Sequence, residues 1–173
     1  MVTLQLTQID IPPGQRVLLH NISWSEFEAI LTELGENRTA RLAYSQGTLE
    51  IQMPSPEHEV DKELIGDMVK ILLEELEIDC ECFGSTTFKR ETKKVGVEPD
   101  QCFYIQNHQL MRGKRRVDLS IDPPPDLPIE IDVTSKTQLE AYETLQVPEL
   151  WRDEDNQLQI NVLQGGKYIT SPN

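Results

Sequence analysis

The chain has 173 residues, of which 30 are acidic and 16 basic, so its formal net charge is -14. This balance excludes a protein that coats nucleic acid through its overall charge, because phosphate binding needs concentrated lysine and arginine. No apolar run approaches the ~20 residues of a spanning helix, the first residues lack a secretory signal, and the three cysteines lack zinc-site spacing, so we expect a cytoplasmic protein.

The first predicted elements are a helix and a hairpin. Ser25 and Glu28 have the spacing of a capping box, in which each side chain binds a free backbone N–H at a helix start. Apolar residues follow at helical spacing until Gly35, which is typical of a helix end. Two short β-type runs, 39–44 and 48–53, come next and flank a Gln-Gly pair, which predicts a β-hairpin.

A long helix is predicted after the hairpin. Ser55 fits its N-cap, and Pro56 fits its first helical position. Acidic side chains load the first turns, which the helix dipole favours. We expect the core-facing stripe to consist of the apolar residues that recur every four positions, which are Val60, Leu64, Met68, Leu72 and Leu76.

From Cys80 onward the pattern changes to short β-type runs with one more helix among them. The runs cover residues 79–83, 86–91, 99–105, 127–133, 150–153, 158–163 and 167–170, and the helix covers 137–145. This order of elements predicts a mixed α/β fold with a central sheet. No repeat or linker interrupts the pattern, so we expect a single domain over residues 1–173.

Positive charge is concentrated in one segment. Residues 84–117 carry eight basic and three acidic side chains, a net charge of +5, which leaves -19 for the remainder of the chain. Such clustering suits phosphate binding, although two solvated loops that are basic without a function give the same pattern. The candidate nucleic-acid-binding residues are Lys89, Arg90, Lys93, Lys94, Arg112, Lys114, Arg115 and Arg116.

Three carboxylates stand in a context that suits a metal site. Asp100 follows Pro99 at the start of an apolar run, and Glu130 and Asp132 interrupt another run. On a strand, residues two apart project from the same face. Because charges in a central strand are costly unless they are paired or bind metal, we interpret these residues as candidate ligands for Mg²⁺ or Mn²⁺. The alternative is an edge strand whose acidic face lies in water.

Four motifs in this order resemble the Uma-two family of putative restriction endonucleases. They are MPSP at 53–56 with His58, GVEPDQCFY at 96–104, DPPPDLPIEIDVTS at 122–135, and Tyr142 with VPELWR at 147–152. The resemblance extends over about residues 44–164. The family is placed in the PD-(D/E)XK nuclease superfamily. The resemblance therefore implies a restriction-endonuclease-like fold, with a central mixed β-sheet flanked by helices, and DNA as the partner.

The resemblance also implies a set of metal ligands. Asp100 matches the Pro-Asp motif, and Glu130 matches the acid of the (D/E)XK motif. The backbone carbonyl of Ile131 is a further candidate ligand. A carboxylate near the start of the long helix often completes such sites, and the candidates here are Glu59 and Glu63, of which we prefer Glu63.

One position departs from the superfamily pattern, because Asp132 stands where the motif lysine is expected. Relatives that lack this lysine carry one on the following helix, at the place where this chain has Gln138. Lys136 is the nearest substitute, and it also fits a solvated residue before the helix. His58 suits either contact with a substrate phosphate or a metal-bound water, or a local capping role. Asp100, Glu130, Asp132 and Lys136 are thus the candidate catalytic residues.

These features lead to a metal-dependent endonuclease that hydrolyses DNA phosphodiester bonds, with Mg²⁺ or Mn²⁺ as cofactor. The missing motif lysine leaves an alternative open, a catalytically inactive protein of the same fold that binds DNA or protein as an accessory module. Hydrolysis of a different phosphoester is a third hypothesis, because fold does not fix substrate. Since nucleases that cut two strands are often dimers, we expect a homodimer.

Overall fold

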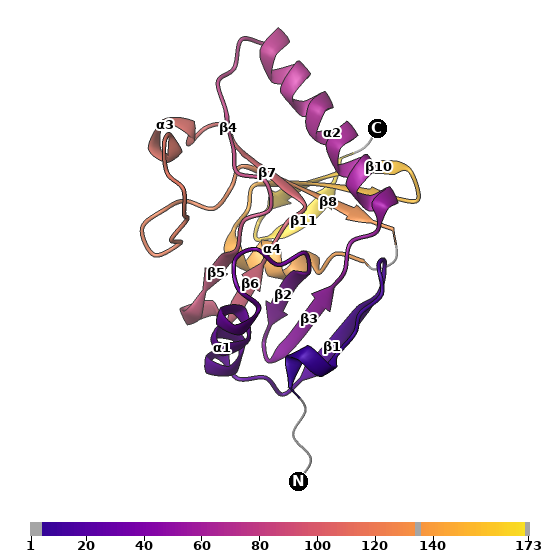
Figure 1. Cartoon of the computed structure of the whole chain (residues 1–173). Helices are drawn as coiled ribbons and strands as arrows, with labels where there is room; N and C mark the ends of the chain where they lie inside the picture. Colours follow the sequence, from indigo (N-terminus) through magenta and orange to yellow (C-terminus); the bar gives the residue numbers. More distant parts are fainter. Residues whose placement is uncertain (1–4, 134–135, 172–173) are drawn as a thin grey trace.

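The computed structural model describes residues 5–133 and 136–171, and the strands of these residues form two sheets (Figure 1). The first sheet is antiparallel throughout, and its strands in spatial order are β1 (Arg16–His20), β3 (Thr48–Gln52), β2 (Arg41–Ser45), β6 (Val95–Val97) and β5 (Phe88–Arg90). The second sheet is mixed, and its strands in spatial order are β11 (Lys167–Thr170), β10 (Gln157–Gln164), β9 (Glu149–Glu154), β8 (Leu127–Asp132), β7 (Gln101–Tyr104) and β4 (Glu81–Cys82). The helices are α1 (Trp24–Leu34), α2 (Pro56–Glu75), α3 (His108–Met111) and α4 (Leu139–Leu145), with short 3-10 turns at Leu6–Gln8 and Glu91–Lys93.

The first sheet packs against α1. The predicted hairpin is confirmed as β2 and β3, and both turn residues, Gln46 and Gly47, have the positive φ that a tight hairpin turn requires. Phe27 of α1 is fully buried and stacks on Tyr44 of β2, with ring centroids 4.7 Å apart. A Cβ on Gly96 of β6 would lie 2.9 Å from the Phe27 ring, so only glycine admits this packing.

The start of α1 differs from the prediction. The capping box is formed by Ser23 and Glu26, and not by Ser25 and Glu28. The two pairs have the same spacing, but Trp24 is already helical, so its predecessor is the N-cap. The Ser23 hydroxyl accepts a hydrogen bond from the Glu26 N–H at 3.3 Å. The predicted end of the helix at Gly35 is confirmed.

The start of α2 at Ser55 and Pro56 is confirmed, but its predicted core stripe is wrong. The buried residues of the helix are His58, Ile65, Gly66, Val69 and Leu73. The apolar side chains on the other face are exposed, and they are Val60, Leu64, Met68, Ile71, Leu72 and Leu76. Two apolar stripes with the same four-residue period therefore run along the helix. The stripe that packs on the second sheet contains Ile65 and Val69, each one residue after a member of the predicted stripe.

Strand β8 separates two environments. Leu127, Ile129 and Ile131 pack against Ile65 and Val69 of α2, whereas Val133, which the alternation also predicted for this face, follows the strand and is exposed. Glu130 and Asp132 project from the opposite face. Strand β9 runs parallel to β8, and the chain between them contains α4. Such a connection is required because parallel neighbours cannot be joined by a tight turn.

Helix α4 lies between the two sheets and helps to join them (Figure 1). Its buried residues Ala141, Tyr142 and Leu145 share one apolar cluster with Val95 and Val97 of the first sheet. Residues of the second sheet, such as Tyr104 and Leu150, complete the same cluster. Within the residues that the structure describes, no helix is long and apolar enough to cross a membrane.

The expectation of one central sheet is corrected to two. The sequence pattern does not predict β1 or β6, and these strands are what make the first sheet more than a hairpin. Strand β6 has only three residues, Val-Gly-Val, which is too short for a recognisable alternation. The short helix α3 is not predicted either, because its four residues carry no helical period.

Candidate functional site

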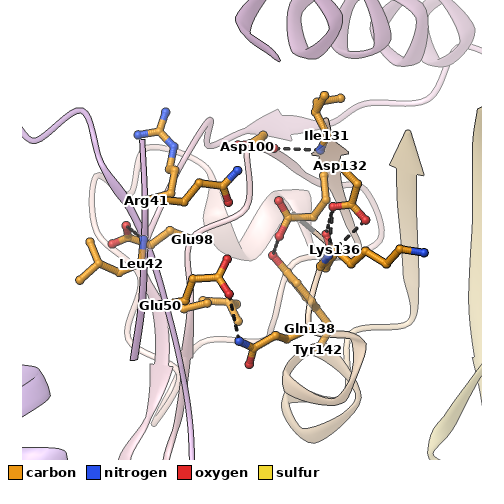
Figure 2. Close-up of a pocket in the computed structure, with 15 residues that line it drawn as sticks. Arg41, Leu42, Glu50, Glu98, Asp100, Ile131, Asp132, Lys136, Gln138 and Tyr142 are labelled. Atoms are coloured by element: carbon orange, nitrogen blue, oxygen red, sulfur yellow. Dashed lines mark hydrogen bonds between the residues drawn. The ribbon is translucent and has the colours of Figure 1, made fainter. Parts of the chain in front are cut away.

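A narrow cleft lies between the two sheets (Figure 2). Its volume is about 40 Å³, enough for a small ion or a few water molecules. Residues of β2 and β3 form one wall, and residues of β8, the segment 136–138 and α4 form the other. The segment 98–100, through which the chain passes from β6 of the first sheet to β7 of the second, also lines the cleft. The chain thus brings carboxylates from both sheets together.

Asp100 is held from two sides. Its side chain is buried, and its Oδ2 accepts a hydrogen bond from the backbone N–H of Ile131 at 2.9 Å (Figure 2). The Nε2 atom of His58, in the first turn of α2, lies 3.0 Å from the same oxygen. Within the described residues, the other oxygen of Asp100 accepts no hydrogen bond. These two contacts hold the carboxylate in place through Oδ2, and the Glu130 carboxyl group lies beside it.

Glu130 projects from β8 into the cleft beside Asp100. The hydroxyl group of Tyr142, from α4, donates a hydrogen bond to Oε1 of Glu130. Burial and the negative charge of Asp100 raise the pKa of Glu130 well above its ordinary value, against the opposing effect of the Tyr142 bond. Two carboxylates this close repel each other unless a proton or a cation joins them.

Asp132 projects from the same face of β8 and is paired. Arg152 of β9 donates a hydrogen bond to Oδ2 of Asp132 at 3.0 Å, and both side chains are buried. The backbone N–H of Thr137 donates to the two carboxylate oxygens at 3.0 and 3.1 Å. Burial raises the pKa of Asp132, and the bonds from Thr137 and the charge of Arg152 offset part of that rise. Asp132 therefore neutralises a buried arginine and anchors the chain before α4.

Two residues expected at the site do not place their charged groups in the cleft. The Lys136 side chain is 79% exposed and turns away from the cleft in Figure 2, with Nζ 2.5 Å from a Glu154 oxygen. The Glu63 side chain is 61% exposed on α2, where the Lys62 ammonium lies 3.5 Å away. Ile131, in contrast, lines the cleft, and its backbone N–H donates the hydrogen bond that holds Asp100.

The donor set of the cleft fits one hard divalent cation. Asp100 and Glu130 offer oxygen atoms, the ligands that Mg²⁺ and Mn²⁺ prefer. No group of three or more His, Cys, Asp or Glu side chains in the described part of the chain is placed to hold a metal ion. Mg²⁺, however, is commonly bound through one or two carboxylates, with water and substrate phosphate as the other ligands. The raised pKa of Glu130 also fits, because a cation would relieve the repulsion that raises it.

The opposite wall of the cleft carries two further buried acids. Arg16 donates a hydrogen bond to Oε2 of Glu50 at 2.9 Å, and Gln138 reaches the same oxygen across the cleft at 3.3 Å (Figure 2). Glu98 accepts hydrogen bonds from the Leu42 N–H at 2.9 Å and from the guanidinium group of Arg38. Both carboxylates are therefore paired with an arginine, whereas Asp100 and Glu130 form no ion pair with an arginine or lysine among the described residues.

A larger groove of about 550 Å³ adjoins the cleft. It is bounded by the second half of α1, the segment 38–41, the start of β5 and the segment 115–117. Arg41 and Glu98 line both the groove and the cleft. The basic residues that line the groove are Arg38, Arg41, Lys89, Arg115 and Arg116, and the acidic ones are Glu28, Glu36 and Glu98.

The structure divides the basic segment predicted from the sequence. Lys89, Arg115 and Arg116 line the groove, whereas Lys93 lines a separate hollow beside α4. The remaining four contact groups away from the groove: Arg90 the carbonyl oxygen of Leu119, Lys94 the ring of Trp24, Arg112 the carboxylate of Glu81, and Lys114 the carboxylate of Asp122. The net charge of the segment therefore does not describe one surface.

Sequence reasoning missed Arg41, Glu50 and Glu98 as residues of the site. Glu50 stands between Leu49 and Ile51, so it interrupts an apolar run as Glu130 does, and the same signal could have found it. Nothing in the local sequence distinguishes Arg41, because only the packing of the sheets brings it to the cleft. The resemblance included Tyr142, and the structure adds its contact with Glu130.

Comparisons with known proteins identify the family of the chain and a solved structure of similar fold. The family model Uma2, described as "Putative restriction endonuclease", matches residues 24–173. No curated protein matches the chain. Among solved structures, the chain is similar to a putative nuclease belonging to DUF820 from Anabaena variabilis ATCC 29413. The two are 16% identical, the match covers 86% of this chain and 83% of that chain, and the TM-score is 0.59. The expected mixed α/β class with a restriction-endonuclease-like fold is thereby confirmed.

Proposed function

Because this chain belongs to the Uma2 family of putative restriction endonucleases, we propose that it is a metal-dependent endonuclease that hydrolyses DNA phosphodiester bonds. The proposed cofactor is Mg²⁺ or Mn²⁺, and its proposed protein ligands are Asp100 and Glu130. We further propose that residues 1–173 act as a single domain and that the protein works in the cytoplasm, a compartment that suits its three free cysteines.

One observation carries the proposal. Asp100 and Glu130 lie side by side at a cleft, and Glu130 carries a pKa raised by burial and by the Asp100 charge. The other buried acids at the cleft are each paired with an arginine, Glu50 with Arg16, Glu98 with Arg38, and Asp132 with Arg152, and Asp100 and Glu130 have no such partner among the described residues. An uncompensated pair of buried carboxylates is costly to a fold, and metal binding is a common reason to keep one.

The residues of the chain have distinct roles in the proposed reaction. His58 and the Ile131 N–H orient Asp100 by holding its Oδ2. Tyr142 orients Glu130 through its hydroxyl group. When bound, a divalent cation would supply charge neutralisation at the scissile phosphate and activation of the attacking water. The burial of both carboxylates strengthens their electrostatic effect on any ion or phosphate at the cleft.

The accessory-module hypothesis keeps one observation in its favour. Arg152 is a buried cation beside the position expected for the motif lysine, and its charge is neutralised by Asp132, which stands at that position. The Lys136 ammonium forms an ion pair with Glu154 outside the cleft. A protein of this fold that binds DNA without cutting it would tolerate both arrangements.

Plasmid cleavage in Mg²⁺ or Mn²⁺ tests the proposal. We expect the wild-type protein to nick supercoiled plasmid, and we expect Asp100→Asn and Glu130→Gln to lower the rate by about 100-fold or more, as for the loss of other groups that act on transition-state charge. Glu63→Gln removes an exposed acid outside the cleft and serves as the matched control, with little expected change. Cleavage that survives both cleft substitutions would contradict the site, and no cleavage by the wild type in either metal would favour the accessory module.

A further inference from the structure

Arg41 is the feature of the site that the proposed reaction leaves unused. It lies on β2 at the boundary between the cleft and the groove, and it lines both. Its Nε atom is buried and has no hydrogen-bond partner, and one Nη donates to the backbone oxygen of Thr39 at 3.2 Å. Within residues 5–133 and 136–171, its guanidinium forms no ion pair, whereas Arg38 and Arg16 both hold acids. A half-buried guanidinium group that forms no ion pair is the arrangement expected of a binding site for an anion.

The groove beyond Arg41 supplies more cations in a continuous hollow. Arg115 and Arg116 come from the loop before Val117, Arg38 lies between α1 and β2, and Lys89 lies on the edge strand β5. Arg38, Lys89 and Arg116 pair with the three acids of the groove, and within the described residues Arg115, like Arg41, has no ion pair. Hydroxyl groups of Thr32, Ser85, Thr86 and Thr87 lie among the lining residues. Arginine, lysine and hydroxyl side chains are the groups that most often contact nucleic-acid phosphates.

The lining of the groove also indicates which form of nucleic acid it suits. None of the residues that line it is aromatic. Proteins that bind single strands combine a positive groove with aromatic rings on which the bases stack. A groove that offers cations and hydroxyl groups but no aromatic ring suits a backbone whose bases are already stacked in a duplex.

We propose that the groove binds the phosphate backbone of a DNA duplex, and that Arg41 binds the phosphate that enters the carboxylate cleft. This inference rests on the proposed nuclease function, whose cleft supplies the reacting groups. Arg41 thereby takes the role of the motif lysine that Asp132 displaces, namely a positive charge on the scissile phosphate. The charge comes from the opposite wall of the cleft, and hence from the first sheet instead of the second.

Binding of a fluorescent duplex at several salt concentrations tests the groove. In Ca²⁺, used to limit cleavage, we expect the double variant Arg115→Gln/Arg116→Gln to bind about tenfold more weakly and to lower the salt slope by about two, because two phosphates no longer meet a cation. The control is Lys93→Gln/Arg112→Gln, which removes the same charge from the same segment at sites outside the groove. Equal weakening by both pairs, or a single strand of the same sequence that binds as tightly as the duplex, would overturn the proposal.

Single-turnover cleavage tests the role of Arg41. We expect Arg41→Gln to lower the cleavage rate at saturating DNA by about 10- to 100-fold and Arg41→Lys to restore part of it, while the Mn²⁺ affinity stays within about twofold of wild type. An unchanged rate in Arg41→Gln would contradict the assignment. If the wild type does not cleave but the groove variants still bind more weakly, the nuclease proposal fails and the groove stands. If cleavage depends on Asp100 but the groove variants bind normally, only the groove fails.

Discussion

Glu130 and Asp132 project from the same face of one strand, two residues apart, and yet they meet opposite charges. Asp132 faces Arg152 at 3.0 Å and two hydrogen-bond donors of Thr137, whereas Glu130 faces Asp100. Burial raises the pKa of both, but only Asp132 has a cation that offsets the rise. Asp132 therefore stabilises the fold through its ion pair, whereas Glu130 destabilises it through repulsion from Asp100. It also explains why an acid at the motif-lysine position does not by itself remove the metal site.

Removing the paired acid should have the largest effect on stability. Asp132→Ala leaves Arg152 buried without its partner, and the loss of one member of a buried pair costs about 3–5 kcal/mol. Urea denaturation measures the change. Asp132→Asn, which keeps the hydrogen bonds from Thr137 in reach, is expected to lose less. A loss below about 1 kcal/mol for Asp132→Ala would show that Asp132 is not the structural member of the two.

Removing the side chain that orients Asp100 should affect function. His58→Ala frees Oδ2 of Asp100 on one side, and changes in the groups that orient metal ligands typically cost 10- to 100-fold in metal affinity or activity. Mn²⁺ binding and plasmid cleavage both measure this effect. His20→Gln changes an exposed histidine on β1 and is expected to leave both quantities near wild type. Unchanged Mn²⁺ affinity in His58→Ala would contradict the orienting role.

Removing the unpaired acid should stabilise the metal-free protein. Glu130→Gln abolishes the repulsion with Asp100, and stabilising changes of this kind commonly give about 0.5–2 kcal/mol. Because the folded-state pKa of Glu130 is raised, the penalty is absent below the ordinary glutamate pKa of about 4.3 and grows as the pH rises toward the folded value. The stabilisation should therefore vanish near pH 4 and increase toward neutral pH.

Thermal melts across this pH range, in the presence of a chelator, measure the difference between Glu130→Gln and the wild type. Glu63→Gln removes an exposed acid and is the control at each pH. A Glu130→Gln protein that is less stable than the wild type at neutral pH would show that Glu130 is satisfied in the fold, as Asp132 is.

The smallest effect is expected at Lys136. Its ammonium is exposed and paired with Glu154, and exposed ion pairs contribute about 0–1 kcal/mol. Lys136→Ala should change the free energy of unfolding by less than about 0.5 kcal/mol and the cleavage rate by less than about twofold. A tenfold loss of cleavage would instead place Lys136 at the reacting phosphate.

The sequence predicts those parts of the fold and site that are local. The alternation of β8 correctly separates Ile129 and Ile131 from Glu130 and Asp132, because a strand has a period of two. The start of α2 at Ser55 and the turn of the hairpin at Gly47 are likewise set by single residues with strong preferences. The mixed α/β class follows from the order of these elements.

What the sequence does not predict depends on packing between distant segments. Two stripes of equal period on α2, one through Leu64 and one through Ile65, compete for the core, and periodicity alone cannot choose between them. The pairing of Asp132 with Arg152 requires the parallel register of β8 and β9. Arg41 reaches the cleft only because the first sheet lies against the second. The basic residues of segment 84–117 are close together in the sequence, but in the folded chain they lie on different surfaces.

Calorimetric titration with Mn²⁺ tests the central claim most directly, because it measures the proposed site without requiring a DNA substrate. We predict one ion bound per chain for the wild type and for Glu63→Gln, with binding weakened by at least about tenfold in both Asp100→Asn and Glu130→Gln. No binding to the wild type at millimolar Mn²⁺, or binding that neither substitution at the cleft weakens, would contradict a metal site formed by Asp100 and Glu130.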